Sequence, residues 1–344
     1  MQQLITRMPK LDLHCHLDGS ITPETLSRLA RQQNLPLPPG GEAALLAHMQ
    51  AGDHCRDLLD YLARFDFVLP YLQTAQALRQ AAHDLVAQAA AEQVRYIEVR
   101  FAPRLHLGRG LTLSQATEAV CLGLAEGQQA TGTIARAILI GMRHEPVQHN
   151  LALIELAAAF APQGVVAVDI AGDEKNYPPM TQRLLFEQAA ARGLAFTIHA
   201  GENGPASNIG DAVSLGAARI GHGTSLRDDP ALLELVRQEG IGIEMCPTSN
   251  IQTRAVAGWQ QYPVADYLAA GLMVSVNTDN RTVSGTTSTR EYTILAERFA
   301  FTPAQLVQVV RNSLATAFLP QNEKSALTAQ VEQELSFLSL AEPP

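Results

Sequence analysis

Short apolar runs alternate along the chain with longer segments whose apolar residues recur at helical spacing. Several of the short runs, such as Val165–Ile170, are almost continuously apolar, which is typical of parallel strands buried on both faces. The predicted strands are Leu11–His16, Tyr96–Phe101, Ala137–Met142, Val165–Ile170, Ala195–His199, Arg219–His222, Ile241–Cys246 and Met273–Asp279. Eight alternating strand and helix units favour an α/β protein built as a TIM (β/α)8 barrel over two separate domains.

The segments between the strands have the periodicity of amphipathic helices and often begin after a threonine, serine or aspartate that can act as N-cap. The clearest predicted helices are Thr74–Gln93, Ser114–Ala130, Met180–Arg192, Pro230–Gln238 and Thr302–Ala315, which we expect to form the outer ring. The first two strands are much farther apart than one βα connection requires, so residues 20–93 are interpreted as a helical lid insertion. Glu323–Leu338 predicts a C-terminal helix outside the barrel, and Ala341–Pro344 a loose tail. Residues 1–344 are interpreted as one domain.

Composition and charge narrow the class of protein. The 344 residues are 47% hydrophobic and carry a net charge of −9, without the basic cluster that a nucleic-acid partner requires. The sequence shows neither a signal peptide nor an apolar run long enough to span a membrane, so we expect a cytoplasmic protein without membrane partners. The four cysteines (Cys15, Cys55, Cys121 and Cys246) are widely spaced and predict neither a disulfide framework nor a cysteine-rich zinc site.

Ligand-type side chains stand at the ends of several predicted strands. His14 and His16 lie two residues apart on a strand and therefore project from the same face, whereas Cys15 points the other way. The residues at the strand ends are His14, His16, His199, Glu202, His222 and Asp279. Because TIM barrels carry their active sites where the strands end, we expect these side chains to share one pocket.

Three histidines and one carboxylate suit Zn²⁺ and leave a coordination position for water. The competing arrangement on this fold is a two-metal hydrolase bridged by a modified lysine at the end of strand four. Residues 169–174 at that place contain no lysine before Lys175, which favours a single metal ion.

Several ordered segments resemble the adenosine deaminase family over nearly the whole chain. They are Met8–Lys10, His14–Ser20, Glu98–Pro103, Asp169–Glu174, His199–Glu202, Arg219–Gly223, Cys246–Thr253 and Asn277–Asp279. The resemblance implies one Zn²⁺ held by His14, His16, His199 and Asp279. It further implies a catalytic group of Glu202, His222 and Asp279, in which Glu202 gives a proton to the purine ring and His222 orients and assists the attacking hydroxide. It also implies nucleoside contacts from His16, Asp18 and Gly172.

The implied reaction is hydrolytic deamination of adenosine and 2′-deoxyadenosine to the inosine products and ammonia, a step of purine salvage. Protonation of the purine ring would relieve the negative charge that develops when hydroxide attacks, which requires a carboxylic acid kept neutral near the ring. Adenine and aminodeoxyfutalosine are alternative substrates. A catalytically silent relative that only binds nucleosides is the alternative from another functional class.

Some residues also admit structural roles. Asp18 can accept a ribose hydroxyl proton or cap the helix predicted at Pro23–Gln33. Gly172 can offer its backbone N–H to the purine or simply form a tight turn. Arg100, Asp173 and Glu174 are predicted to be buried ion-pair partners, and the segment 246–250 to be part of the rim.

The chain departs from the family pattern after the last strand. Two aspartates and a proline are usual there, whereas this chain has Asp279, Asn280 and Arg281. The second aspartate of relatives contacts purine N7, and the Asn280 amide can donate a hydrogen bond to the same atom. Arg281 can attract a phosphate or carboxylate on an extended nucleoside, although a solvated arginine is the simpler interpretation.

Overall fold

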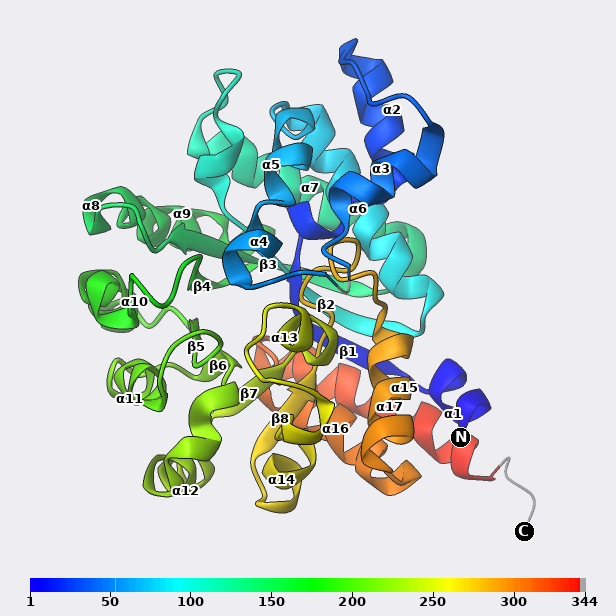
Figure 1. The fold of residues 1–344 in the computed structure, drawn as a ribbon, viewed down its shortest axis with the longest axis vertical. Helices are drawn as coiled ribbons and strands as arrows, with labels where there is room; N and C mark the ends of the chain where they lie inside the picture. The colour runs from blue at the N-terminus through cyan, green and yellow to red at the C-terminus, as the bar shows by residue number, and fades with distance from the viewer. Residues whose placement is uncertain (53, 341–344) are drawn as a thin grey trace.

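The computed structural model describes residues 1–52 and 54–340 and confirms the TIM barrel (Figure 1). Its eight strands are β1 Lys10–His16, β2 Val94–Phe101, β3 Ile134–Met142, β4 Val165–Ala171, β5 Thr197–Ala200, β6 Arg219–His222, β7 Gly242–Met245 and β8 Met273–Val276. They form two parallel four-stranded sheets in the orders β1-β2-β3-β4 and β5-β6-β7-β8. The tail predicted at Ala341–Pro344 lies outside the described residues.

Two short seams join the sheets into a closed barrel. Val168 on β4 bridges to Phe196 just before β5, and Cys15 on β1 bridges to Asp279 after β8. At the second seam the Asp279 N–H donates to the carbonyl of His14, and the His16 N–H donates to the carbonyl of Asp279, both at 2.7 Å. The ends of the first and last strands are therefore hydrogen-bonded to each other.

Strand β8 is shorter than predicted from the sequence, and the backbone explains why. The predicted strand continues to Asp279, whereas the regular ladder stops at Val276. The Asn277 side chain accepts a hydrogen bond from the Leu13 N–H at 2.8 Å, in place of a ladder bond. Asp279 itself has φ +58°, in the left-handed region that an extended strand excludes.

Helices surround the strands, most of them on the outside of the barrel. They are α1 Gln2–Arg7, α2 Pro23–Gln33, α3 Gly41–Met49, α4 Leu58–Leu62, α5 Phe65–Val68, α6 Ala75–Ala91, α7 Leu113–Thr131, α8 Val147–Asn150, α9 Ala152–Phe160, α10 Arg183–Ala191, α11 Ala206–Ser214, α12 Pro230–Gln238, α13 Pro247–Gln252, α14 Val264–Ala269, α15 Ser288–Phe299, α16 Pro303–Thr316 and α17 Gln321–Leu340. Thr74, Asp229 and Thr302 cap α6, α12 and α16 through their side-chain oxygens, as the sequence predicts.

The segment between β1 and β2 has two parts. Helix α6 packs along α7 in the outer ring, where Gly123 and Gly127 let the two helices approach closely. Helices α2 to α5 gather on one side of the barrel in Figure 1, and α4 and α5 contribute side chains to a cavity at its mouth. The lid-like part of residues 20–93 therefore ends before α6.

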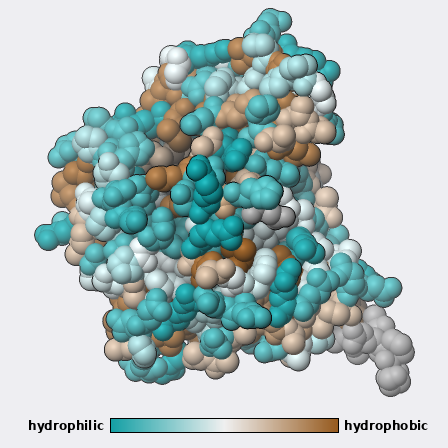
Figure 2. All heavy atoms as spheres, viewed as in Figure 1, coloured by the Kyte–Doolittle hydropathy of each residue, from teal (hydrophilic) through white to brown (hydrophobic). Residues whose placement is uncertain are grey.

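One face of the outer surface is mostly polar. The face drawn in Figure 2 is largely hydrophilic, with hydrophobic residues showing in small separate areas. Across residues 1–52 and 54–340, no helix combines the length and the apolar character needed to cross a lipid bilayer.

Candidate active site

The histidines and the aspartate predicted from the strand ends meet at the mouth of the barrel. The rings of His14 and His199 lie 4.5 Å apart between centroids, and those of His14 and His16 lie 5.3 Å apart. The carboxylate oxygen Oδ1 of Asp279 lies 3.5 Å from His14 Nε2 and 3.3 Å from His16 Nε2. All four side chains are buried, so they form one compact cluster of potential metal ligands.

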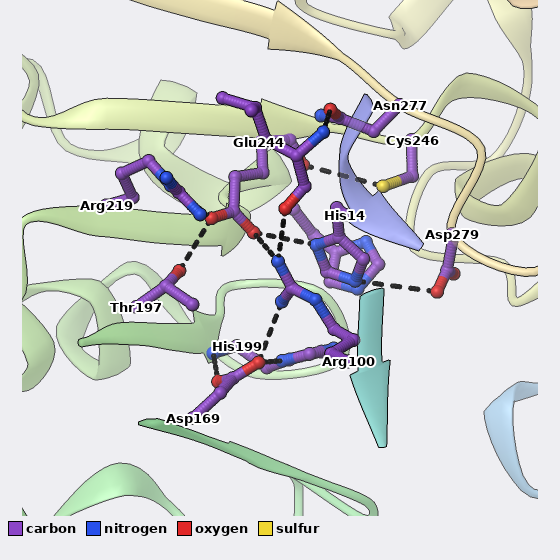
Figure 3. Close-up of polar contacts among 12 residues, drawn as sticks. His14, Arg100, Asp169, Thr197, His199, Arg219, Glu244, Cys246, Asn277 and Asp279 are labelled. Carbon is purple, nitrogen blue, oxygen red and sulfur yellow. Dashed lines mark hydrogen bonds and ion pairs between the residues drawn. The ribbon is translucent and has the colours of Figure 1, made fainter. Parts of the chain in front are cut away.

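Buried carboxylates orient two of these histidines (Figure 3). Glu244 Oε2 lies 2.8 Å from His14 Nδ1, and Asp169 Oδ2 lies 2.8 Å from His199 Nδ1. The hydrogen bond of His14 holds the proton on its Nδ1 and leaves its Nε2 free as a ligand atom. His14 Nε2 is indeed buried without a hydrogen-bond partner. The donor set therefore fits a divalent metal ion.

Arg100 joins the two orienting carboxylates. Its guanidinium lies 2.7 Å from Asp169 and 2.9 Å from Glu244, and all three side chains are fully buried. Burial alone would favour a neutral Glu244, but the adjacent arginines Arg100 and Arg219 hold the pKa of Glu244 well below its usual range. The ion-pair role predicted for Arg100 is confirmed, whereas Glu244 and Arg219 were not singled out from the sequence.

Burial also sets the charge of the histidines. It lowers the pKa values of His16, His199 and His222, so these rings are neutral at pH 7. Neutral imidazole is the form that binds metal ions and accepts protons. His14 differs, because hydrogen bonds with Asp279 and Glu244 raise its pKa despite burial. The neutral rings of His16 and His199 beside the Asp279 carboxylate are ligands suited to a divalent metal ion.

The backbone after β8 delivers the Asp279 carboxylate to the cluster. Asp279 Oδ1 faces the histidines and accepts a 2.7 Å hydrogen bond from Asn280 Nδ2, while Oδ2 accepts one of 2.5 Å from Ser249 Oγ. Segment 246–250, interpreted from the sequence as rim, therefore also supports the cluster. The row of polar residues after β7 is the feature of the sequence that could have indicated this supporting role.

Glu202 stands beside the cluster on the loop after β5. Its Oε2 lies 3.7 Å from His222 Nε2. Burial, reinforced by the charges of Asp279 and Glu174, raises the pKa of Glu202 to about 8. Glu202 is therefore protonated at neutral pH, the state that a general acid requires.

Glu174 holds the loop that carries Glu202. Its carboxylate accepts hydrogen bonds from the backbone N–H groups of Gly201, Glu202 and Asn203 at 2.7, 3.0 and 2.9 Å. Asn208 Nδ2 donates a fourth at 2.9 Å. The sequence predicted an ion-pair partner here. The structure shows a different arrangement, because backbone amides satisfy the buried carboxylate.

We expect Glu174→Gln to lower kcat about tenfold while leaving the metal content unchanged. An amide has one acceptor oxygen and turns N–H donors toward the loop amides, so at least one charge-assisted hydrogen bond is lost. Steady-state kinetics and elemental analysis measure the two quantities. Asp173→Asn, whose parent side chain accepts hydrogen bonds from Asn176, is the matched control. An equal fall of kcat in both variants would contradict the loop-holding role.

A cavity of about 260 Å³ opens beside the cluster. Its lining residues are His16, Asp18, Leu58, Tyr61, Leu62, Phe65, Asp66, Leu69, Ala102, Leu105, Ile140, Met142, His144, Ala171, Gly172, His199, Glu202, His222, Asp279 and Asn280. The apolar residues from α4 and α5 were not identified from the sequence, because nothing in their local pattern distinguishes a cavity wall from a helix core. The cavity thus combines an apolar wall with a polar cluster.

The predicted substrate-binding residues line this cavity. The cap alternative for Asp18 is wrong, because Thr22 Oγ1 accepts the capping hydrogen bond from Thr25 at the start of α2. Burial raises the pKa of Asp18 to about 6. Gly172 has φ +112°, which strongly favours glycine at this wall of the cavity.

Arg281 does not face the cavity. It is 4% exposed and pairs with Glu92, while its Nη1 lies 3.7 Å from Asp12 Oδ2. Both expectations for Arg281, recognition of a substrate anion and solvation, are therefore wrong. The arginine instead ties the loop after β8 to the end of α6 and to β1. Asn280, its neighbour, remains at the cavity wall.

Comparison with known proteins agrees with this geometry. The sequence profile described as adenosine deaminase matches residues 9–334. The adenosine deaminase of Enterococcus faecalis is 46% identical over 333 residues, which are 97% of this chain and 98% of that protein. The adenosine deaminase of Lacticaseibacillus paracasei is 40% identical over 332 residues, covering 96% of this chain and 98% of its own.

Solved structures show the same architecture. An adenine deaminase from Arthrobacter aurescens superposes with a TM-score of 0.88 at 27% identity, covering 96% of this chain and 99% of its own. A zinc-bound amidohydrolase from Burkholderia ambifaria also has a TM-score of 0.88, at 25% identity, covering 98% and 93%. Sequence profile, relatives and site geometry agree: the chain is a metal-dependent hydrolase that belongs to the adenosine deaminase family.

Proposed function

We propose that this enzyme deaminates adenosine and 2′-deoxyadenosine by zinc-dependent hydrolysis, releasing the inosine products and ammonia. The observation that carries the proposal is the juxtaposition of a metal-ligand cluster with a carboxyl group kept protonated at neutral pH. The adenosine deaminases that are 46% and 40% identical to this chain support the choice of substrate.

The proposed zinc ligands are His14, His16, His199 and Asp279. A zinc ion bound there would lower the pKa of a coordinated water to about 7 and so supply a nucleophile at neutral pH. Metal sites with only hard oxygen ligands prefer cations other than zinc. A set of three imidazoles and one carboxylate is characteristic of zinc. The zinc-bound relative described above has the same barrel.

Glu202 is the proposed proton donor to purine N1. Attack at C6 places negative charge on the ring, and a proton at N1 neutralises it. The buried, protonated carboxyl of Glu202 is suited to this task, and the Glu174 carboxylate holds its loop in place. His222 is proposed to orient the attacking oxygen, and Asp18 to accept a hydrogen bond from the ribose.

The charge of the cavity favours an uncharged substrate. Asp18, Asp66, Glu202 and Asp279 line it, and no lysine or arginine occurs among the described lining residues. A nucleotide phosphate would meet carboxyl groups without a compensating cation, which is electrostatically costly. We therefore propose a nucleoside rather than a nucleotide as the substrate.

Free adenine is the second candidate substrate, because the adenine deaminase from Arthrobacter aurescens shares 27% identity and the fold. The fall in absorbance near the adenosine maximum, recorded in parallel with adenosine, 2′-deoxyadenosine, adenine and AMP, tests both proposals. Turnover of the two nucleosides with little turnover of AMP would support ours. Faster turnover of adenine would identify adenine as the substrate instead. If none of the four compounds reacts, the result would favour a catalytically silent protein that only binds nucleosides.

Asn280 is proposed to contact purine N7. One hydrogen of its Nδ2 is engaged by Asp279, and the second can donate to a bound ligand. We expect Asn280→Ala to weaken catalysis with adenosine by about 0.5–1.5 kcal/mol while the metal stays bound.

The 7-deaza analogue of adenosine provides the control, because carbon at that position cannot accept a hydrogen bond. The analogue should react poorly with the native enzyme and lose little more in the variant. Asn280→Asp should lose activity as pH rises, since only a protonated carboxyl can donate. Equal losses for adenosine and the analogue on Asn280→Ala would show that Asn280 does not touch N7.

A further inference from the structure

A chain of three buried side chains leads from outside the cavity to His222. The Tyr262 hydroxyl donates to Asn250 Oδ1 at 3.1 Å, and Asn250 Nδ2 lies 2.9 Å from His222 Nδ1. Tyr262, Asn250 and His222 are 3%, 0% and 1% exposed. Water therefore cannot substitute for these hydrogen bonds, and each donor must face an acceptor.

The direction of the chain follows from its first member. Burial raises the pKa of Tyr262 well above its usual range, so the phenol keeps its proton. The hydroxyl hydrogen is thus directed to Asn250, which places the amide oxygen toward Tyr262 and the amide NH₂ toward His222.

An amide NH₂ can only donate, so the atom that it meets must accept. His222 Nδ1 is therefore unprotonated, and in a neutral imidazole the proton must then reside on Nε2. A protonated imidazole would present a donor at Nδ1 to the donating amide, so the same contact excludes the charged ring. Nε2 is the nitrogen on the cavity side, 3.7 Å from Glu202 Oε2.

We propose that Asn250, held in place by Tyr262, is a positioning residue that keeps the proton of His222 on Nε2, so that His222 acts as a hydrogen-bond donor toward the cavity. The tautomer stands on the contacts alone, whereas its catalytic consequence rests on the proposed function. In that reaction the neutral His222 orients an oxygen atom by donating to it and does not remove its proton.

The backbone and the neighbouring rings keep the His222 ring in this orientation. His222 has φ +65°, an uncommon conformation for a residue other than glycine. As the last residue of β6, it is paired with Ala200 of β5. The rings of His14 and His199 lie 4.7 and 5.1 Å away between centroids. Rotation of the ring by 180° about χ2 would displace Nδ1 from Asn250 and present a carbon atom to it.

Imidazole ¹⁵N chemical shifts test the tautomer directly. In zinc-loaded enzyme labelled at histidine, long-range ¹H–¹⁵N spectra distinguish a protonated from an unprotonated ring nitrogen, and His222→Ala identifies the signals. We expect an unprotonated Nδ1 and a protonated Nε2 without any substrate present. A protonated Nδ1 in the native enzyme would overturn the proposal.

Two variants separate positioning from simple packing. Asn250→Asp replaces the donor with an acceptor, so a proton should appear on Nδ1 and kcat should fall roughly tenfold with little change in KM. Tyr262→Phe keeps the shape of the aromatic ring but removes the hydrogen bond that orients the Asn250 amide. Both tautomers of His222 should then be populated. Asn150→Asp, a change of another buried asparagine, is the control for destabilisation and should leave the His222 signals in place.

The outcomes are distinguishable. An unchanged tautomer in both Asn250→Asp and Tyr262→Phe would overturn the positioning role, and if Asn250→Asp fails to fold, Tyr262→Phe alone decides. The native spectrum is recorded without nucleoside. Absence of deaminase activity together with the expected spectrum would therefore refute the proposed function and leave the tautomer assignment standing.

Discussion

Glu202→Gln should reduce kcat by about 10²–10⁴-fold, the range typical of a lost general acid. Glutamine preserves the shape of the side chain and the backbone contacts of its loop with Glu174, but its amide cannot release a proton to N1. Metal content and nucleoside binding should persist, because Glu202 is not a proposed metal ligand and glutamine removes only the transferable proton. Single-turnover kinetics, elemental analysis and calorimetric binding of a nucleoside measure the three quantities.

The pH profile of the native enzyme provides a second test of Glu202. Burial raises its pKa to about 8, and the protonated form is the active one. Activity should therefore be retained below that pH and be lost as pH rises through it. This limb should vanish in Glu202→Gln. Glu187→Gln, on the exposed surface of α10, is the control for a generic loss of charge. A variant that kept near-native kcat would show that another group supplies the proton.

Removing the metal, or one of its proposed ligands, should abolish turnover while leaving the barrel folded. Chelation, His14→Ala and Asp279→Ala all remove the proposed source of the nucleophile, which no other group in the cavity can replace at neutral pH. The strands that carry the ligands are already hydrogen-bonded in the sheets, so their arrangement does not depend on the ion. Elemental analysis and circular dichroism follow metal and fold separately.

Re-addition of zinc sharpens this prediction. Activity should return to the chelated native enzyme but not to His14→Ala or Asp279→Ala. His149→Ala, a change of a half-exposed histidine paired with Glu145, is the control and should retain its zinc. Active native enzyme without any metal would refute the metal-dependent mechanism.

The sequence predicts the barrel well because burial on both faces leaves a direct mark on composition. Runs such as Val165–Ile170 lack the spacing of polar residues that is typical of an amphipathic helix. His14 and His16 share a face by the geometry of any strand. Strand ends were less predictable. Asp279 is predicted to close the last strand, yet the ladder ends at Val276 and Asp279 has a left-handed backbone.

The support of the site was harder to predict, because it depends on which strands become neighbours. Glu244 stands alone inside an apolar strand, and only the fold shows that His14 and Arg100 meet it. Arg281 shows the opposite error: a charge beside a predicted binding residue suggested an anion site, whereas its partner Glu92 comes from a distant helix end. Spacing within one strand identifies a face but not the residues opposite it.

The seam between the first and last strands couples the chemistry to the completion of folding. His14 lies on the first strand and Asp279 follows the last, and where the barrel closes the Asp279 N–H donates to the His14 carbonyl while the His16 N–H donates to the Asp279 carbonyl. Contacts between such distant residues carry the largest loop-closure cost and form late in folding. A nascent or truncated chain that lacks β8 therefore has three imidazoles but no closed ring of ligands. Metal affinity in this protein thus reports that the barrel has been assembled, from its first strand to its last.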